Sequence, residues 1–363
     1  MKKIFKIVLT GGPCAGKTTL ISRINQIFSL KGYRIFTVNE TATELINNGL
    51  KPFGDCVDMK TFQGFVLDTQ LAKEKTYIKA AEFVKEDKVL IIFDRGLLDN
   101  KAYISDEYFS SLVHARGLTE SKLRNSYDLV IHLVTAAKGA PEAYNLDNAA
   151  RTEGIEEAIK LDERTCQCWV GHRHLRIIDN SNNFEAKMKK ALDEISLFLG
   201  EPIPLENEKK FLIKTPDFSK IPTIKEERII QTYLNKNGKN ERRLRQVGTD
   251  NDYTHFYTER NILPGNEMIE TEKRITQDDY LNLLVEADTS LRQIIKKRYY
   301  FLYNDQYFRL DVYPFSRDNA LLEISLTDKN QELIIPDFIE VIEDVTFNDS
   351  YKNINIAKNL SFN

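Results

Sequence analysis

The chain has 363 residues, enough for two domains, and its 42% apolar and 29% charged residues are typical of a soluble globular protein. A net charge of −3 argues against general nucleic-acid binding, which requires a strongly basic surface. The four cysteines lack the paired spacing of a zinc site or a disulfide framework, so we expect reduced thiols and a cytoplasmic protein.

The amino-terminal segment superficially resembles a signal peptide. Its apolar run is short and is interrupted by Gly11 and Gly12, so a buried strand over residues 5–9 explains it better. No other stretch approaches the length of a membrane span. We therefore expect no transmembrane segment, and restrict any membrane contact to peripheral association.

Residues 1–200 alternate short apolar runs with helical patterns. This alternation predicts an α/β domain, in which a mostly parallel sheet is covered by helices on both faces. The expected strands are residues 5–9, 33–38, 89–93, 129–134 and 175–178. Two prolines in residues 201–205 predict a linker, and residues 206–363 would form a second domain.

Residues 11–18, Gly-Gly-Pro-Cys-Ala-Gly-Lys-Thr, match the phosphate-loop pattern without a mismatch and lie between an expected strand and an expected helix. Backbone N–H groups and the helix N-terminus would cradle the phosphates of GTP or ATP. Lys17 would reach the β and γ phosphates, and Thr18 would bind Mg²⁺. The predicted cradle consists of Gly11, Gly12, Pro13, Cys14, Ala15, Gly16, Lys17, Thr18 and Thr19.

Two carboxylates follow expected strands of this domain. Asp94 ends the apolar run 89–93 and would hold Mg²⁺, unless it only forms a turn or caps a helix. Glu40 follows the strand 33–38 and would accept a substrate proton, or merely cap the next helix. We assign catalytic roles to Lys17, Asp94, Glu40 and Arg151.

Other polar residues are candidates for closing over the nucleotide. Arg151 or Arg164 would act as a lid arginine, the alternative being a solvated helix face. Asn180 ends the last expected strand and would contact the base. Trp169 and His172 would stack or hydrogen-bond there, or pack in the core.

The second domain has a different texture, with strand-like segments that carry charges at alternating positions. Charges that share one strand face would line a tunnel if an antiparallel sheet curls into a β-barrel with that face inward, and would meet solvent if it faces outward. The expected strands are residues 206–213, 242–247, 271–276, 294–303, 307–313 and 321–326, with helices at 276–286 and near 353–360.

The pattern Glu206-x-Glu208-x-Lys210 resembles the opening signature of the CYTH, or triphosphate tunnel, superfamily, and residues 338–346 and 351–358 resemble its ending. This resemblance implies a tunnel that binds polyphosphate and divalent metal. Phosphate would be bound by Lys210, Arg243, Arg245, Lys273, Lys296 and Arg298. Mg²⁺ or Mn²⁺ would be held by Glu206, Glu208, Asp311, Glu323 and Glu340.

The N-terminal half resembles kinases of nucleosides and nicotinamide riboside, and the whole chain resembles the TRP-channel translocation-defect family. That family implies GTP binding at the phosphate loop, association with phosphatidic acid and a trafficking role in animals. The matching segments are residues 10–19, 40–44, 94–96, 127–132, 151–154, 169–172, 178–180, 297–298 and 338–346.

Departures from the tunnel pattern leave three functions open. Glu323 is followed two residues on by Ser325 and Glu340 by Ile342, where tunnel enzymes usually carry a second glutamate. Losing these acids would weaken metal binding and favours an NTP-binding protein, or slow NTPase, whose tunnel binds polyphosphate or a phospholipid head group. The intact opening signature keeps a tunnel triphosphatase open, and Glu40 keeps a small-molecule kinase open.

Overall fold

The computed structural model describes residues 2–362 except 140, 142–153, 181–182, 201–207, 223, 238–239, 250–251, 263–267 and 327–331. The chain divides into two compact units, Met1–Ile195 and Ser196–Asn363. The expected linker at 201–205 lies outside the described residues, so the predicted domain boundary stays a prediction.

The first unit contains a parallel sheet of five strands in the order β2-β3-β1-β4-β5. Its central strands bury large apolar side chains on both faces, as β3 does with Ile91 and Ile92. The strands are β1 (Lys3–Thr10), β2 (Arg34–Val38), β3 (Lys88–Asp94), β4 (Leu129–Leu133) and β5 (Leu175–Ile178).

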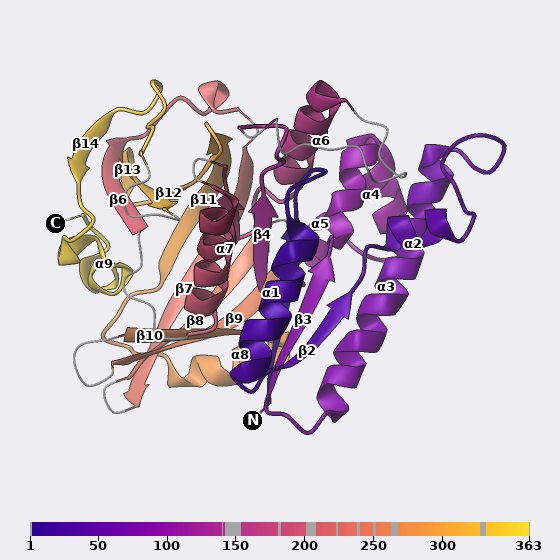
Figure 1. The fold of residues 1–363 in the computed structure, drawn as a ribbon. Helices are drawn as coiled ribbons and strands as arrows, with labels where there is room; N and C mark the ends of the chain where they lie inside the picture. The colour runs from indigo at the N-terminus through magenta and orange to yellow at the C-terminus, as the bar shows by residue number, and fades with distance from the viewer. Residues whose placement is uncertain are drawn as a thin grey trace. The chain divides into compact units, whose positions relative to one another are not determined.

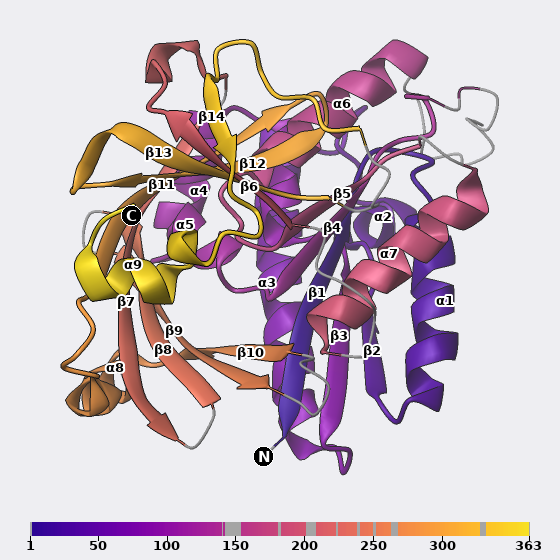
Figure 2. The same ribbon diagram turned by 90° about the vertical axis from the view of Figure 1, so that its left-hand side faces the viewer.

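Helices cover this sheet on both sides. Figure 2 shows α1 on one side of β1, β2 and β3 and α3 on the other. No helix in the described part of the chain is long and apolar enough to cross a membrane. The helices of the first unit are α1 (Lys17–Leu30), α2 (Thr41–Asn47), α3 (Met59–Phe83), η1 (Leu97–Tyr103), α4 (Asp106–His114), α5 (Glu120–Arg124), α6 (Ile155–Cys168) and α7 (Phe184–Phe198), labelled in Figure 1 where space allows.

The loop after β1 lies where the strand order of the parallel sheet reverses, because the later strands β3 and β4 lie on opposite sides of β1. β1 pairs with β3 on one side and β4 on the other, so Leu9 lies beside Asp94 and Thr10 lies beside His132. Ligands of open parallel sheets bind at such a position, outside the carboxyl ends of the strands.

The second unit contains an antiparallel sheet of nine strands in the order β10-β9-β8-β7-β11-β12-β13-β6-β14. The predicted fold class, an α/β P-loop domain followed by an antiparallel domain, is confirmed. The elements of the second unit are β6 (Glu208–Lys214), η3 (Phe218–Lys220), β7 (Lys225–Asn237), β8 (Asn240–Thr249), β9 (Asp252–Ile262), β10 (Met268–Ile275), α8 (Gln277–Leu283), η4 (Leu284–Glu286), β11 (Ile294–Tyr303), β12 (Gln306–Tyr313), β13 (Ser316–Ser325), β14 (Val341–Asp344), η5 (Asp349–Tyr351) and α9 (Asn353–Asn359).

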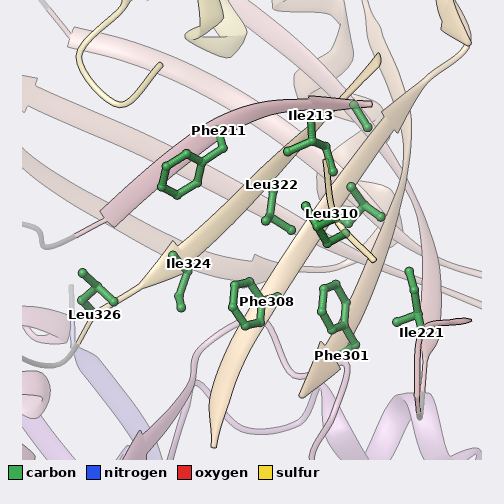
Figure 3. Packing of buried hydrophobic residues seen from close by; sticks show 11 residues of the cluster. Phe211, Ile213, Ile221, Phe301, Phe308, Leu310, Leu322, Ile324 and Leu326 are labelled. Carbon is green, nitrogen blue, oxygen red and sulfur yellow. The ribbon is translucent and has the colours of Figure 1, made fainter. Parts of the chain in front are cut away.

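The two faces of this sheet differ in chemistry because successive side chains of a strand point to opposite faces. One face carries an apolar core that includes Phe308 and Leu322, shown in Figure 3 with its neighbours from β6, β11 and β13. Arg309 and Glu323, each one residue further along, belong to the other face. Charged side chains are thus held against the second face of a well-packed sheet.

Candidate functional site

The loop between β1 and α1 adopts a shape that only glycine allows at two of its positions. Gly11 has φ 131°, and a Cβ there would lie 2.0 Å from the carbonyl oxygen of Leu133. Gly16 has φ 94° and is the N-cap of α1. The glycines of the phosphate-loop pattern therefore meet a steric need, and Thr18 and Thr19 follow them, exposed, in the first turn of α1.

Lys17 turns back over this loop. Its Nζ donates to the carbonyl oxygens of Gly11 at 3.0 Å and Gly12 at 2.9 Å. Burial, and secondly the charge of Arg95, lower the pKa of Lys17 to about 8. The ammonium is thus held at the loop in a partly desolvated position, where a phosphate would strengthen its charged form.

Asp94 ends β3 beside the loop. Its Oδ1 atom is buried and has no hydrogen-bond partner among the described residues. Burial raises the pKa of this carboxyl group, although the charge of Lys17 opposes the shift. A buried carboxylate oxygen without a donor suits a cation ligand, so the chemistry of Asp94 is compatible with the predicted Mg²⁺ site.

Glu40 lies in the same group of charges. It is the N-cap residue of α2 but its side chain makes no capping bond. Instead it accepts from Arg95 Nε at 3.2 Å and from the Thr43 hydroxyl at 2.8 Å. Burial raises the pKa of Glu40, but Arg95 and Lys17 together hold it below its ordinary value.

Arg95 is positioned by its backbone. It has φ 75°, its N–H donates to Leu9 at 3.0 Å, and its carbonyl oxygen accepts from Gln70 at 3.1 Å. Gln70 also donates to Glu74 at 3.2 Å, and the Tyr127 hydroxyl donates to Glu74 at 2.7 Å. A buried polar network behind the site therefore supports the left-handed turn at Arg95.

This network predicts a pH-dependent stability. Burial raises the pKa of Glu74 to about 7, so the folded chain holds a proton that the unfolded chain releases near pH 4.5. Stability should therefore fall as the pH rises from 4.5 to 7. The Glu74→Gln variant has no carboxyl group to ionise at this position. Its free energy of unfolding relative to the wild type should therefore be roughly 2 to 4 kcal/mol larger at pH 8 than at pH 5. Urea unfolding at the two pH values measures this difference.

Glu82→Gln, on an exposed part of the same helix, is the control and should leave the pH dependence as in the wild type. An unchanged pH dependence in Glu74→Gln would show that Glu74 does not ionise in this range.

Two acidic side chains that the sequence analysis did not select hold the edge together. Asp99 accepts from the Thr10 hydroxyl at 2.5 Å, from Trp169 Nε1 at 2.9 Å and from the Gly96 N–H at 2.7 Å. Asp162 is buried beside Gly12 and bonded to its N–H group. Asp162 thus bonds the backbone of the phosphate loop, whereas Asp99 bonds the backbone after β3 and the side chain of Thr10.

The predicted base contacts lie in different surroundings. Trp169 and His172 are buried in the core, and burial lowers the pKa of His172 to about 3, which keeps its ring neutral. Asn180 donates to the carbonyl oxygens of Thr135 at 2.7 Å and Lys138 at 2.6 Å, so it orders the loop after β4.

Two arginines were predicted as lid residues. Arg164 donates to the carbonyl oxygen of Ile104 at 3.3 Å. Arg151 lies outside the described residues.

The second unit brings several of its predicted residues into one buried ion-pair cluster. Asp311, fully buried on β12, accepts from Lys296 at 2.6 Å and from two nitrogens of Arg298, each at 2.6 Å. Glu323 accepts from Arg298 at 3.0 Å and from Lys210 at 2.9 Å. The members share one face because Arg298 pairs with Asp311, and Glu323 with Lys210, across neighbouring strands.

Burial and charge balance each other in this cluster. Burial lowers the pKa of Lys296 to about 8 although Asp311 opposes the shift. Burial acts to raise the pKa of Asp311, but Arg298 and Lys296 hold it below its ordinary value. Arg309 bonds Glu208 and was not among the predicted phosphate-binding residues. It belongs to the alternating charges of its strand, since it precedes Asp311 by two residues and both point to one face.

The remaining predicted phosphate-binding residues lie on β8 and β10. Arg245 of β8 bonds Glu272 of β10, and Arg243 is buried on the same strand as Arg245, two residues before it. Lys273 is exposed and its ammonium lies 5.2 Å from the centre of the Tyr257 ring.

Two predicted metal ligands are not part of the cluster that the structure describes. Glu340 is exposed and pairs with Lys214 at 2.5 Å. Glu206 lies outside the described residues. Within the described ranges, no three His, Cys, Asp or Glu side chains are arranged to hold a metal ion.

Comparisons with known proteins cover parts of the chain. Residues 6–187 match the sequence model of a family described as "AAA domain". Among solved structures, the protein NE1496 is similar in two determinations, titled as a hypothetical protein and as an inorganic triphosphatase. They share 30% and 28% identity, cover 42% and 43% of this chain and 98% and 96% of theirs, with a TM-score of 0.32 each.

A third solved structure, the PH1012 protein from Pyrococcus horikoshii OT3, shares 19% identity. The match covers 34% of this chain and 81% of that one, with a TM-score of 0.26. No curated protein matches the chain.

Proposed function

The chain belongs to the AAA domain family, whose model matches half of its 363 residues, and on this premise we propose that its first unit binds a nucleoside triphosphate with Mg²⁺. One observation carries the proposal. The ammonium of Lys17 is held at the loop carbonyls, beside the buried and unbonded Oδ1 of Asp94. A cation would supply the missing partner of Asp94 Oδ1, and a phosphate would give the Lys17 ammonium an anionic partner in place of neutral carbonyl oxygens.

Mg²⁺ would be held by Asp94 and the Thr18 hydroxyl. When bound, the ion would neutralise charge on the β and γ phosphates. The chain's own residues do the rest: Lys17 binds phosphate, and Glu40 and Arg95 fix each other next to it.

The choice between GTP and ATP is tested by calorimetric titration of each with Mg²⁺, together with phosphate release over time. Binding of either nucleotide supports the proposal, and release of phosphate would add a slow NTPase activity. Binding of neither nucleotide, with or without Mg²⁺, would overturn it.

For the second unit we infer a site for polyphosphate or the head group of an acidic phospholipid. The supporting observation is a buried face that gathers Lys210, Lys296, Arg298 and Arg309. The resemblance to the TRP-channel translocation-defect family favours phosphatidic acid. Vesicles of phosphatidylcholine with and without phosphatidic acid, competed with tripolyphosphate, distinguish the two sources of phosphate.

A metal-dependent triphosphatase is the alternative for the same face. Each acid of the cluster is already bonded to a base, as Asp311 is to Arg298 and Glu208 to Arg309. An anion alone would displace carboxylates and leave them unpaired, whereas a metal ion and polyphosphate together would give acids and bases new partners. The alternative therefore predicts that metal and polyphosphate bind cooperatively.

Tripolyphosphate affinity should then rise by about tenfold or more when Mn²⁺ or Mg²⁺ is present, a coupling of typical size for two interacting ligands. The titration is done in the Lys17→Met variant, so that the phosphate loop does not contribute, and is corrected for metal–tripolyphosphate complexes in solution. Equal affinity with and without metal would favour simple anion binding and contradict the enzyme alternative.

A small-molecule kinase is the alternative for the first unit. Glu40 favours it, because this carboxylate makes no capping bond and lies in the charged group with Lys17 and Arg95. Transfer of labelled γ-phosphate to an added nucleoside would support a kinase. Label recovered only as free phosphate, across a panel of nucleosides, would exclude those acceptors.

A further inference from the structure

The side of the phosphate loop is bonded to a buried carboxylate from a distant helix. Asp162, on α6, is 3% exposed. Its Oδ1 accepts from the Gly12 N–H at 2.5 Å and from the Thr135 N–H at 3.2 Å. Its Oδ2 lies 3.4 Å from Nε2 of His132, which ends the backbone pairing of β1 with β4. One side chain thus joins the loop after β1, the loop after β4 and α6.

The contact is close enough to restrict residue 12. A Cβ built on Gly12 would lie 2.9 Å from both Cβ and Oδ1 of Asp162, so the carboxylate occupies the space that a side chain would need. The next residue is held too, since the Thr135 hydroxyl donates to the Pro13 carbonyl at 2.5 Å. The first half of the loop is therefore fixed from outside, before any contact with a ligand.

Burying the negative charge of Asp162 costs free energy unless its oxygens are hydrogen-bonded. A buried carboxylate near a phosphate site loses hydration and repels phosphate. Here both its oxygens have partners: two backbone N–H groups share Oδ1, and Oδ2 faces His132. The carboxylate acts on the backbone through Oδ1, at the point where the chain enters the phosphate loop.

We propose that Asp162 is a positioning residue that holds the phosphate loop in its nucleotide-binding shape through the acceptor atom Oδ1. This inference rests on the proposed nucleotide binding by the first unit. In this inference, nucleotide affinity depends on the position of the acceptor atom Oδ1 and not on the negative charge of the carboxylate.

Three substitutions separate these roles. Asp162→Asn keeps the acceptor and loses the charge, so its Kd for Mg²⁺–nucleotide should stay within about threefold of the wild type. Asp162→Ala loses the acceptor, and Asp162→Glu keeps the charge but moves the acceptor towards Gly12. Both should raise the Kd by about tenfold or more, the effect of leaving a buried N–H group without its acceptor. Glu163→Gln, next on the helix and half-exposed, is the control and should bind as the wild type does.

Amide hydrogen exchange of the nucleotide-free protein gives a readout that does not require binding. The N–H groups of Gly12 and Thr135 should be protected in the wild type and Asp162→Asn, and should exchange faster in the alanine and glutamate variants. If the wild type binds no nucleotide, the proposed function fails, while the exchange data still decide the role of Asp162. Equal protection in all variants, or a wild-type Kd in Asp162→Ala, overturns the inference. If the alanine variant does not fold, the contrast between asparagine and glutamate decides.

Discussion

Replacing Lys17 with methionine is expected to weaken nucleotide binding roughly 100-fold, because the variant removes the desolvated ammonium that lies over the phosphate loop. Methionine keeps most of the volume of the side chain. Since the pKa of Lys17 is lowered in the folded protein, the unfolded chain binds more protons between pH 8 and 10.5, and stability rises with pH across that window. Below pH 8 the charged lysine costs stability, so the variant should unfold at no lower temperature than the wild type.

This pairing of lost binding with retained stability separates a binding role from a folding defect. Titration calorimetry measures the first, and thermal unfolding at pH 7 the second. Lys31→Met, at the exposed opposite end of α1, is the matched control and should leave the Kd unchanged. Nucleotide affinity within threefold of wild type in Lys17→Met would place the nucleotide elsewhere.

Replacing Asp311 with asparagine is expected to destabilise the second unit by about 3 to 5 kcal/mol, the cost of leaving buried charges without their counter-charge. Asparagine keeps the shape of the side chain, so the loss reports on charge. Lys296 and Arg298 would remain in the interior with one carboxylate fewer. Because Asp311 raises the pKa of Lys296, its loss lets Lys296 lose its proton at a lower pH than in the wild type. The penalty should therefore shrink as the pH rises towards 8 and level off above it.

Urea unfolding followed by circular dichroism measures this change. The only tryptophan, Trp169, is buried in the first unit, so its fluorescence follows that unit and serves as an internal reference. Glu340→Gln makes the same acid-to-amide change in an exposed ion pair, and should cost no more than about 1 kcal/mol. A loss of that size in Asp311→Asn would mean that the cluster contributes no more than a surface pair.

The strands of the first unit could be predicted because burial on both faces leaves unbroken apolar runs in the sequence. The predicted strand 175–178 coincides with β5, and 5–9 lies within β1. The phosphate loop was recognisable because its glycines answer local steric needs, which a short motif records. The matched segments and their order along the chain also gave the correct fold class.

The strands β7 and β9 were not predicted, because polar side chains share their buried positions with apolar ones. In β7 the buried positions include Glu227 and Gln231, and in β9 they include Thr254 and Thr258. The regular alternation of apolar and polar residues that indicates a half-buried strand is then incomplete. β14 is a short strand whose residues are all exposed, and it shows no alternation either.

Side-chain direction explains where the predicted tunnel residues differ from those that the structure groups. Along β10, Glu272 is bonded to Arg245 whereas the next residue, Lys273, is exposed. Moving one residue along a strand places the side chain on the opposite face of the sheet. In a charged segment without apolar neighbours, the sequence does not indicate which residues belong to which face. Glu340, similarly, lies on an exposed segment that the family resemblance alone had selected.

Asp162 left a trace in the sequence that was not used. It lies on the buried stripe of α6 with Ala158, Thr165 and Cys166, at helical spacing. A carboxylate on the core side of an amphipathic helix calls for a specific partner. That partner, 150 residues earlier in the chain, could be identified only from the fold.

The shared space of Gly12 and Asp162 has an evolutionary consequence. Any side chain at position 12 would overlap the aspartate, and any retreat of the aspartate would leave the loop's N–H group without its acceptor. Neither position can drift alone without loss, so the two should coevolve: descendants of this chain that gain a side chain at 12 should also have exchanged residue 162. Covariation between these positions would record a contact that no local sequence pattern reveals.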